Sequence, residues 1–260
     1  MLNTAIKAAR AAGDIIQYGA RNLDRLSIDS KGPGDFVTDI DRNAEGAIVD
    51  TLLGAYPHHG ILAEEGSGST RGKADASHVW IIDPLDGTTN FLHGVPQYAV
   101  SIALSVEGVI TQAVVYDPAK NDLFTASRGA GAFLNNRRIR VSKRAKLHDA
   151  LIGTGLPFRE GSDFEATLAQ LRALMPRCAG IRRAGAAALD LAWVAAGWYD
   201  GFWEMKLHPW DMAAGALLVL EAGGLVTGLD GEASYLHSGA IVAATPKIFP
   251  DLLKLLTAPA

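Results

Sequence analysis

The sequence has little cysteine: Cys178 is the one thiol among 260 residues. A single thiol excludes a disulfide within the chain and a zinc site built from several cysteines. Proteins whose cysteines stay unpaired are typical of a reducing compartment. We therefore expect a cytoplasmic protein.

Long uncharged apolar runs are also missing. A membrane-spanning helix needs about 18 or more consecutive apolar residues, and the most apolar stretch, MAAGALLVLEAGGLV, is interrupted by Glu221. Near the start of the sequence, Lys7, Arg10 and Asp14 break the apolar pattern at helical spacing, unlike in a secretion signal. We expect no membrane contact, and predict a buried helix followed by a strand for the apolar stretch.

An excess of positive charge is absent as well. The 24 Lys and Arg residues against 28 Asp and Glu residues give a net charge of −4. Dedicated nucleic-acid-binding proteins are usually basic, so no direct contact with nucleic acid is expected. The hydrophobic share of 48% and the charged share of 20% are ordinary for a globular protein.

The first half of the sequence predicts two helices on an antiparallel sheet. An opening helix is predicted with one apolar face formed by Leu2, Ile6, Ala9, Ile15 and Ile16. Residues 41–56 predict a second helix after a polar loop, SKGPGDFVTD. Residues 78–83 predict a buried strand. The alternating segments from 98 to 139 predict a meander of antiparallel strands.

After about residue 145 the pattern changes to alternating strands and helices, which is typical of an α/β arrangement. Residues 163–175 predict an amphipathic helix with Phe164, Leu168 and Leu171 on its apolar face, and a last helix starts near Pro250. We expect residues 1–260 to form a single unit with two lobes, about 1–145 and about 146–260.

Two carboxylates end an apolar strand in VWIIDPLDGTTNF, where Asp83 and Asp86 follow four apolar residues. Like charges at one strand end repel each other unless a cation lies between them. Asp41, Glu64 and Asp211 also stand at the edges of apolar segments. Each acid alone is typical of a turn or a helix cap, but the set together indicates divalent cations, Mg²⁺ or Mn²⁺ rather than zinc.

The residues after these acids favour an anion. Gly87 allows the backbone to approach a ligand closely. Thr88 or Thr89 is predicted to cap a helix whose free N–H groups point at the anion. Cations beside such a helix start suit phosphoryl transfer. Histidines such as His93 and His208 are expected to be structural or to lie at the rim of the site.

Several long motifs resemble the inositol monophosphatase family, most of all its bacterial SuhB-type members. They are WIIDPLDGTTNF, HPWDMAAGALLVLEAGG, DFVTDID, AEE and RRAGAAALDLAWVAAGWYDGFWE, and the resemblance covers essentially the whole chain. It implies a mixed α+β and α/β fold, a layered αβαβα sandwich. It also implies Mg²⁺-dependent hydrolysis of a phosphate monoester, inhibition by Li⁺ and a homodimer.

The resemblance further implies a role for each matching residue. Two or three Mg²⁺ ions, for which Mn²⁺ is a substitute, would be held by Glu64, Asp83, the Leu85 carbonyl, Asp86 and Asp211. Thr88, paired with Asp41 and helped by Glu64, would activate a water. Substrate contacts would come from Glu64, Asp86, Gly87, Thr88, Arg182 or its neighbour Arg183, Gly185, Ala186, Ala187, Glu204 and Asp211.

The substrate implied first is a phosphorylated polyol, myo-inositol 1-phosphate. Histidinol phosphate, fructose 1,6-bisphosphate, a nucleotide and NADP stay open as alternatives within the same chemistry. A different class of function is also implied, because SuhB-type relatives act as protein partners of the transcription machinery. The acidic net charge is compatible with such a protein partner.

Overall fold

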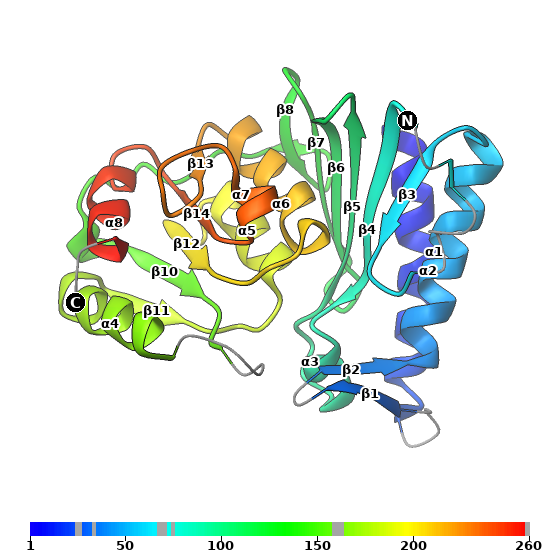
Figure 1. The fold of residues 1–260 in the computed structure, drawn as a ribbon, viewed down its shortest axis with the longest axis horizontal. Helices are drawn as coiled ribbons and strands as arrows, with labels where there is room; N and C mark the ends of the chain where they lie inside the picture. The colour runs from blue at the N-terminus through cyan, green and yellow to red at the C-terminus, as the bar shows by residue number, and fades with distance from the viewer. Residues whose placement is uncertain (24–27, 33–34, 67–71, 74–75, 158–163, 258–260) are drawn as a thin grey trace.

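The fold consists of five layers, seen side by side in Figure 1. A computed structural model describes residues 1–23, 28–32, 35–66, 72–73, 76–157 and 164–257. From right to left in Figure 1 the layers are helices α1 and α2, a seven-stranded sheet, helices α5 and α6, a five-stranded sheet, and helices α4 and α8. The predicted αβαβα sandwich is confirmed.

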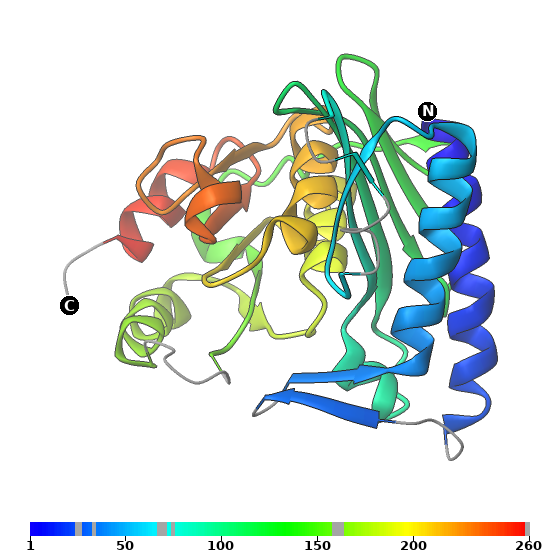
Figure 2. The ribbon, with the colours of Figure 1, turned by 45° about the vertical axis from the view of Figure 1, so that its right-hand side comes forward.

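The outer helices of the first half are α1 (Leu2–Ala20) and α2 (Asp39–Ala55), which lie side by side against the seven-stranded sheet (Figures 1 and 2). Most side chains that α1 buries completely are alanines, such as Ala8 and Ala12, together with Ile16. Small side chains let this helix approach α2 and the sheet closely. The predicted face members Leu2, Ile6 and Ile15 are only partly buried at its rim.

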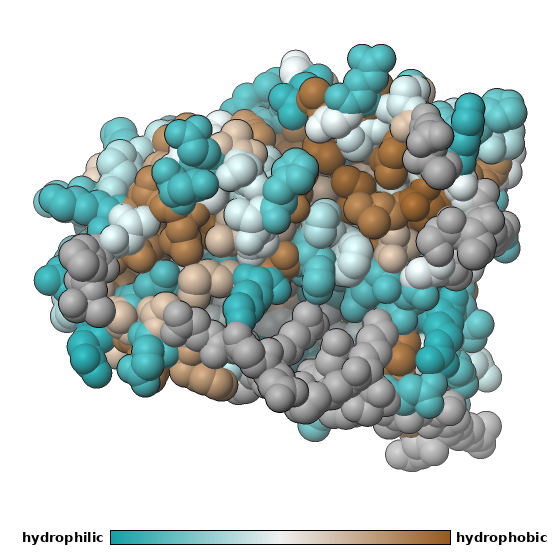
Figure 3. Space-filling view, in the orientation of Figure 1, coloured by the Kyte–Doolittle hydropathy of each residue, from teal (hydrophilic) through white to brown (hydrophobic). Residues whose placement is uncertain are grey.

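The seven-stranded sheet confirms the predicted meander. Its order is β3-β4-β5-β6-β7-β8-β9, and every neighbouring pair is antiparallel except β3 with β4, which is parallel. Figure 3 shows hydrophobic surface near the edge strand β3, where Leu62 is 39% exposed. The strands are β3 (Gly60–Ala63), β4 (His78–Asp86), β5 (Ala99–Val106), β6 (Val109–Asp117), β7 (Asp122–Ser127), β8 (Gly131–Leu134) and β9 (Arg137–Arg138).

A small hairpin replaces the predicted polar loop before α2. Strands β1 (Ile28–Gly32) and β2 (Asp35–Thr38) pair antiparallel with each other. The prediction of a loop was wrong. The two strands are short and belong to neither large sheet. They therefore lack the long alternation of apolar and polar residues that marks a strand on a packed sheet.

The five-stranded sheet has the order β11-β10-β12-β14-β13. Strand β10 is parallel to both of its neighbours, and β14 is antiparallel to both of its own. The strands are β10 (Leu151–Thr154), β11 (Gly180–Arg182), β12 (Gly201–Glu204), β13 (Leu225–Thr227) and β14 (Ile241–Ala244). Short elements complete the chain: α3 (Thr88–Leu92), α7 (Tyr235–Ser238) and 3₁₀ turns at Leu147–Asp149 and Met175–Arg177.

Helices α5 (Ala187–Ala196) and α6 (Pro209–Glu221) fill the space between the two sheets. One hydrophobic cluster joins them to residues of the seven-stranded sheet such as Ala103 and Phe124. A Cβ placed on Gly215 would lie 2.5 Å from the Cβ of Leu191, so the two helices pack in close contact at that point. The predicted buried helix followed by a strand is confirmed as α6 and β13.

Helix α4 (Phe164–Leu174) contradicts the predicted apolar face. Phe164 is 56% exposed and Leu168 is 51% exposed, whereas Gln170 is buried. The buried amide has hydrogen-bond partners, because its Oε1 accepts from Trp203 Nε1 at 3.0 Å and its Nε2 donates to the Leu256 carbonyl at 3.2 Å. Helix α8 (Phe249–Leu256) starts beside its proline, as expected.

Cys178 is a free, partly buried thiol. Among the described residues, every helix is too short or too polar to cross a lipid bilayer.

A stacked histidine between α2 and β3 gives a prediction about pH. The ring of His59 stacks against Tyr56 and His78, with centroid distances of 4.8 Å in both cases. Burial, followed by the nearby charges of His78 and His58, lowers the pKa of His59 from 6.5. The unfolded chain then binds more protons, so His59 costs stability as the pH falls through its unfolded pKa.

When the pH is lowered from about 7.5 to about 5.5, we expect the Tm of a His59→Gln variant to fall by about 1–2 °C less than the Tm of the wild type. Melting curves at both pH values measure the difference within each protein. The matched control is His148→Gln, because the side chain of His148 is 87% exposed. Equal acid sensitivity of all three proteins would contradict the prediction.

Candidate active site

A β-bulge brings Asp83 and Asp86 to one pocket. In a regular strand, residues three apart point to opposite faces. Here Asp83 pairs with Ser101 and Asp86 pairs with Ala99, so three steps along β4 match two along β5. The extra residue turns the strand and re-aims its side chains. Pro84 fits here because a bulge interrupts the hydrogen-bond ladder that a proline cannot join.

Asp83 is surrounded by other acids. Its Oδ1 accepts the Leu85 N–H at 2.9 Å, and its carboxyl group hydrogen-bonds with Glu64. Burial first, and then the charges of Glu64, Asp86 and Asp211, raise the pKa of Asp83 well above its usual range. In the absence of a cation, Asp83 therefore favours its protonated form.

Asp86 and Asp211 each fix a helix that comes from the second half of the chain. Asp86 Oδ2 accepts the Ala188 N–H in the first turn of α5 at 2.7 Å, and Asp211 Oδ2 accepts the His208 N–H before α6 at 2.7 Å. Burial and then the charge of Asp211 raise the pKa of Asp86 well above its usual range. Both acids thus combine a structural contact with a place among the pocket carboxylates.

Thr88 is the first residue of α3, and the prediction that a threonine caps this helix was wrong. The N-cap is Gly87, whose φ of +94° lies in the left-handed region that glycine adopts without strain. The hydroxyl of Thr88 is therefore not used as a cap. Its Oγ1 lies 3.0 Å from Asp41 Oδ1 and 3.1 Å from the Leu85 carbonyl.

Asp41 lies behind Thr88 in the first turn of α2 and is 1% exposed. Its Oδ2 accepts from the Thr38 N–H at 2.9 Å and from the Thr38 hydroxyl at 2.6 Å. Burial raises the pKa of Asp41, and the hydrogen bonds from Thr38 and Thr88 oppose that rise. The capping box of α2 thus holds one carboxylate oxygen, and the other oxygen faces the hydroxyl of Thr88.

Most predicted site residues line one pocket of about 750 Å³. Three predicted residues do not line it: Asp41 lies behind Thr88, Ala186 is the buried N-cap of α5, and Arg182 is exposed and donates to the Ile181 carbonyl. The neighbouring Arg183 lines the pocket instead. The predicted residues that line it are Glu64, Asp83, Leu85, Asp86, Gly87, Thr88, Gly185, Ala187, Glu204 and Asp211.

The donor chemistry of this pocket fits a hard divalent cation. Within the described part of the chain, no three Asp, Glu, His or Cys side chains are already arranged as a ligand set. However, Asp83 is buried among the charges of Glu64, Asp86 and Asp211, whose cost a cation would offset. Carboxylate oxygens without sulfur suit Mg²⁺. Binding would require Asp83 and Glu64 to turn from hydrogen bonding with each other toward a shared ion.

One residue of the pocket, Gly155, and one buried acid near it, Asp190, were missed from the sequence. Gly155 lines the pocket, and a Cβ placed on it would lie 1.8 Å from Glu204 Oε1, so the carboxylate of Glu204 occupies the space beside this glycine. Asp190 in α5 is 1% exposed, and its Oδ1 has no hydrogen-bond partner within the described residues. Burial, followed by the charges of Glu204 and Asp86, raises the pKa of Asp190. In the sequence, Asp190 could have been noticed as an acidic residue inside an otherwise apolar helix.

Comparisons with known proteins agree over nearly the full length. A family profile described as "Inositol monophosphatase family" matches residues 1–258. A "Putative Nus factor SuhB" of Neisseria meningitidis serogroup B is 56% identical over 257 residues, 99% of this chain and 98% of that protein. An "Inositol-1-monophosphatase" of Mesorhizobium japonicum is 48% identical over 259 residues, 100% of this chain and 97% of that protein. The solved structure of extragenic suppressor protein suhB from Bartonella henselae has a TM-score of 0.95 and 45% identity, and the match covers 99% of this chain and 98% of that one.

Proposed function

The chain belongs to the inositol monophosphatase family, and from this membership we propose that it is a Mg²⁺-dependent phosphatase acting on myo-inositol 1-phosphate. The observation that carries the proposal is the hydrogen-bonded pair of Thr88 and Asp41 beside the carboxylates around Asp83. A phosphate ester needs both an activated water and compensation of its negative charge. The pocket has groups suited to each task.

Glu64, Asp83, the Leu85 carbonyl, Asp86 and Asp211 would hold Mg²⁺, with two or three ions per site and Mn²⁺ as a substitute. When bound, such ions lower the pKa of a water and offset the charge that develops on the phosphate. Asp86 and Asp211 keep one oxygen each on a helix N–H, at 2.7 Å in both cases, which limits how far each carboxylate can turn. Asp86 and Asp211 thus have partly fixed carboxylates, whereas Asp83 and Glu64 would have to turn from their mutual hydrogen bond toward the ion.

Thr88 and Asp41 would orient the attacking water. A hydroxyl has one hydrogen and two lone pairs. When Thr88 donates to Asp41 across 3.0 Å, its lone pairs stay open to a water in the pocket. Asp41 accepts this bond through Oδ1, and its hydrogen bonds from Thr38 oppose the rise in its pKa that burial causes. Glu64, which lines the same pocket as Thr88, would assist as a second acceptor for the water.

The two ends of the substrate would contact different halves of the chain. The N–H groups of Gly87 and Thr88 would hold the phosphate. The alcohol would lie against Gly185 and Ala187, where the carboxylate of Glu204 can accept hydrogen bonds from hydroxyl groups. Ala186, predicted as a third contact, is buried behind them and does not line the pocket. Arg183 replaces Arg182 in this proposal because it lines the pocket.

A panel of phosphate esters tests the proposed substrate. Steady-state kinetics in Mg²⁺ would compare myo-inositol 1-phosphate with histidinol phosphate, fructose 1,6-bisphosphate, a nucleoside monophosphate and NADP. We expect the highest kcat/KM for the inositol ester, and inhibition of its hydrolysis by Li⁺. A far higher kcat/KM for histidinol phosphate would overturn the substrate assignment and leave the phosphatase chemistry in place.

A second role, as a protein partner in transcription, is supported by relatives that carry the name Nus factor, such as the SuhB protein of Pseudomonas aeruginosa at 53% identity over 255 residues. The catalytic and binding roles can be separated with an Asp83→Asn variant. If the Asp83→Asn variant corrects a phenotype of the gene deletion, the result would support the binding role. If only the wild type corrects the deletion phenotype, that phenotype would be assigned to hydrolysis. The proposal also includes a homodimer in the cytoplasm.

Gly155 provides a prediction about selectivity. In a Gly155→Ala variant the new methyl group would meet the carboxylate of Glu204, which is the flexible end of a side chain and can move. We therefore expect little change in Tm but a fall of about tenfold in kcat/KM for inositol 1-phosphate, the effect of roughly one lost hydrogen bond.

The matched control is Gly46→Ala in α2, because a Cβ at Gly46 meets nothing within 4 Å. Gly46→Ala should leave the kinetics unchanged. Unaltered kinetics in Gly155→Ala would show that the position of Glu204 does not matter for the substrate. A large loss of Tm in Gly155→Ala would show instead that the glycine serves the fold.

A further inference from the structure

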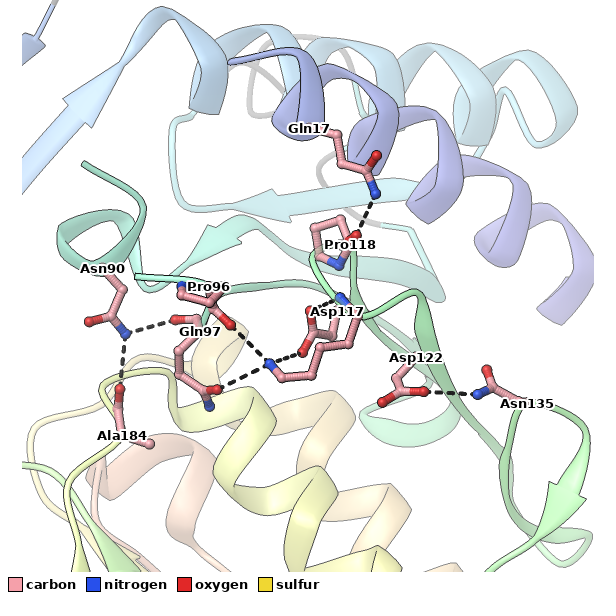
Figure 4. Close-up of polar contacts among 10 residues, drawn as sticks. Gln17, Asn90, Pro96, Gln97, Asp117, Pro118, Asp122, Asn135 and Ala184 are labelled. Carbon is pink, nitrogen blue, oxygen red and sulfur yellow. Dashed lines mark hydrogen bonds and ion pairs between the residues drawn. The ribbon is translucent and has the colours of Figure 1, made fainter. Parts of the chain in front are cut away.

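An amide side chain outside the predicted site joins the two halves of the pocket. Asn90 lies in α3, and its Nδ2 points at residues 184–187, which we name the alcohol loop (Figure 4). Nδ2 lies 2.7 Å from the Gln97 carbonyl, 2.9 Å from the Ala184 carbonyl and 3.4 Å from the Gly185 carbonyl. An amide nitrogen has two hydrogens, so the two short contacts use its full donor capacity.

The Gln97 side of this junction is firmly anchored. Lys120 donates to the Pro96 carbonyl at 2.9 Å and to Gln97 Oε1 at 3.4 Å (Figure 4). The same ammonium group pairs at 2.7 Å with Asp117, whose side chain is 1% exposed. Lys120 is thus fixed to the end of β6, and through it the segment around Gln97 is fixed to the sheet. Asn90 therefore ties the alcohol loop to a rigid part of the molecule.

The backbone segments at this junction meet too closely for side chains. Gly87 and Gly185 both have left-handed φ angles, +94° and +89°. A Cβ on Gly87 would lie 2.9 Å from the Gln97 carbonyl oxygen and 3.3 Å from that of Gly185, and a Cβ on Gly185 would lie 3.0 Å from Asn90 Nδ2. The position of the alcohol loop is therefore defined by contacts between backbone and the Asn90 amide.

The carboxylate side of the pocket is held in a different way. Asp83 and Asp86 belong to β4, and their backbone positions are set by pairing with Ser101 and Ala99 of β5. Loss of the Asn90 amide would leave this ladder intact. It would remove the side-chain contacts to the Ala184 and Gly185 carbonyls and loosen the alcohol loop ahead of the Asp86–Ala188 hydrogen bond. This loop contains predicted contacts to the alcohol but none of the predicted metal ligands.

We propose that Asn90 is a positioning residue that fixes the alcohol loop against the catalytic segment and thereby sets which alcohol the enzyme accepts. The proposal rests on the phosphatase function above and deepens it. Asn90 acts through the backbone of residues 184–187 and contacts neither the reacting phosphate nor the water.

The test compares Asn90→Asp and Asn90→Ala with a matched control, Asn135→Asp. The Asn90→Asp change removes the donors and turns a carboxylate toward carbonyl oxygens, whereas Asn90→Ala only removes the donors and is the milder variant if the first one does not fold. Asn135 donates its amide to Asp122 at an exposed site, so the control undergoes the same chemical change away from the pocket. The substrates are inositol 1-phosphate and p-nitrophenyl phosphate, whose leaving group has no aliphatic hydroxyl groups.

We expect both Asn90 variants to lower kcat/KM for inositol 1-phosphate by about tenfold or more, mainly through KM. Hydrolysis of p-nitrophenyl phosphate should change by less than about threefold, and the control should change neither. Equal losses with both substrates, or no loss with either, would overturn the proposal.

Amide hydrogen exchange provides a readout that needs no activity. Exchange at Gly185 and Ala188 should be faster in the Asn90 variants than in the wild type and in Asn135→Asp. Unchanged exchange there would overturn the positioning role. If the wild type hydrolyses neither ester, the phosphatase proposal fails, and the exchange data alone decide whether Asn90 positions the loop.

Discussion

An Asp83→Asn variant will lose phosphate-ester hydrolysis by about a thousandfold or more and stay folded. Asn has nearly the shape of Asp but carries no charge, so it removes the proposed ligand that is central to the acid cluster. The loss should appear in kcat at saturating Mg²⁺. Circular dichroism should report an unchanged secondary structure.

The same variant should be more stable than the wild type when metal is removed. The pKa of Asp83 is raised by burial and by Glu64, so the folded wild type loses stability as the pH rises through that pKa. Asn cannot ionise and is spared this loss. In EDTA at about pH 8, the variant should therefore have the higher Tm, and the difference should shrink toward about pH 5.

Asp200→Asn is the control with the opposite expectation. Asp200, just before β12, is 3% exposed and accepts the Leu151 N–H at 2.7 Å and the Ser142 hydroxyl. Its replacement should lower Tm and leave hydrolysis at the wild-type rate. Substantial hydrolysis by Asp83→Asn would contradict the proposed site, and a large fall in its Tm without metal would contradict the account of charge repulsion.

Removal of divalent cations will abolish hydrolysis and lower the melting temperature of the wild type. Free Mg²⁺ at about a hundred times its dissociation constant adds about 2.7 kcal/mol to the free energy of unfolding. For a chain of this size that corresponds to about 5–10 °C in Tm. Differential scanning calorimetry in EDTA and in a series of Mg²⁺ concentrations measures the shift.

Two controls separate specific binding from ionic strength. Potassium chloride at matched ionic strength should not reproduce the shift, and Asp83→Asn should show most of it lost. A melting temperature of the wild type that is the same in EDTA and in Mg²⁺ would contradict a site built from several carboxylates.

The strands and the acid cluster were predictable because their signals are local. The run before Asp83 is apolar for its whole length, and the segments on both sides of Gly108 alternate with period two, so both were recognised as strands. The family resemblance then connected Glu64, Asp83, Asp86 and Asp211, which the structure brings to one pocket. Local pattern and long motifs together were enough for the αβαβα order.

The remaining features depend on contacts between distant parts of the chain. Helix α4 buries Gln170 because Trp203 needs an acceptor, a partner 33 residues away. The hydroxyl of Thr88 contacts Asp41, which is 47 residues away, and the junction around Asn90 depends on a carbonyl 94 residues away. Side-chain patterns within one segment carry no information about such partners.

The layer of α5 and α6 has a consequence for how the protein is made. One face of the seven-stranded sheet, including Ala103 and Phe124, is covered by residues of these two helices. The sheet is complete in sequence at Arg138, but α6 ends only at Glu221. During synthesis, the strands of the sheet are therefore complete before the helices that cover this face, and more than a quarter of the chain is added in between. A newly made chain in this interval exposes an apolar sheet face, and we expect chaperones to bind it there.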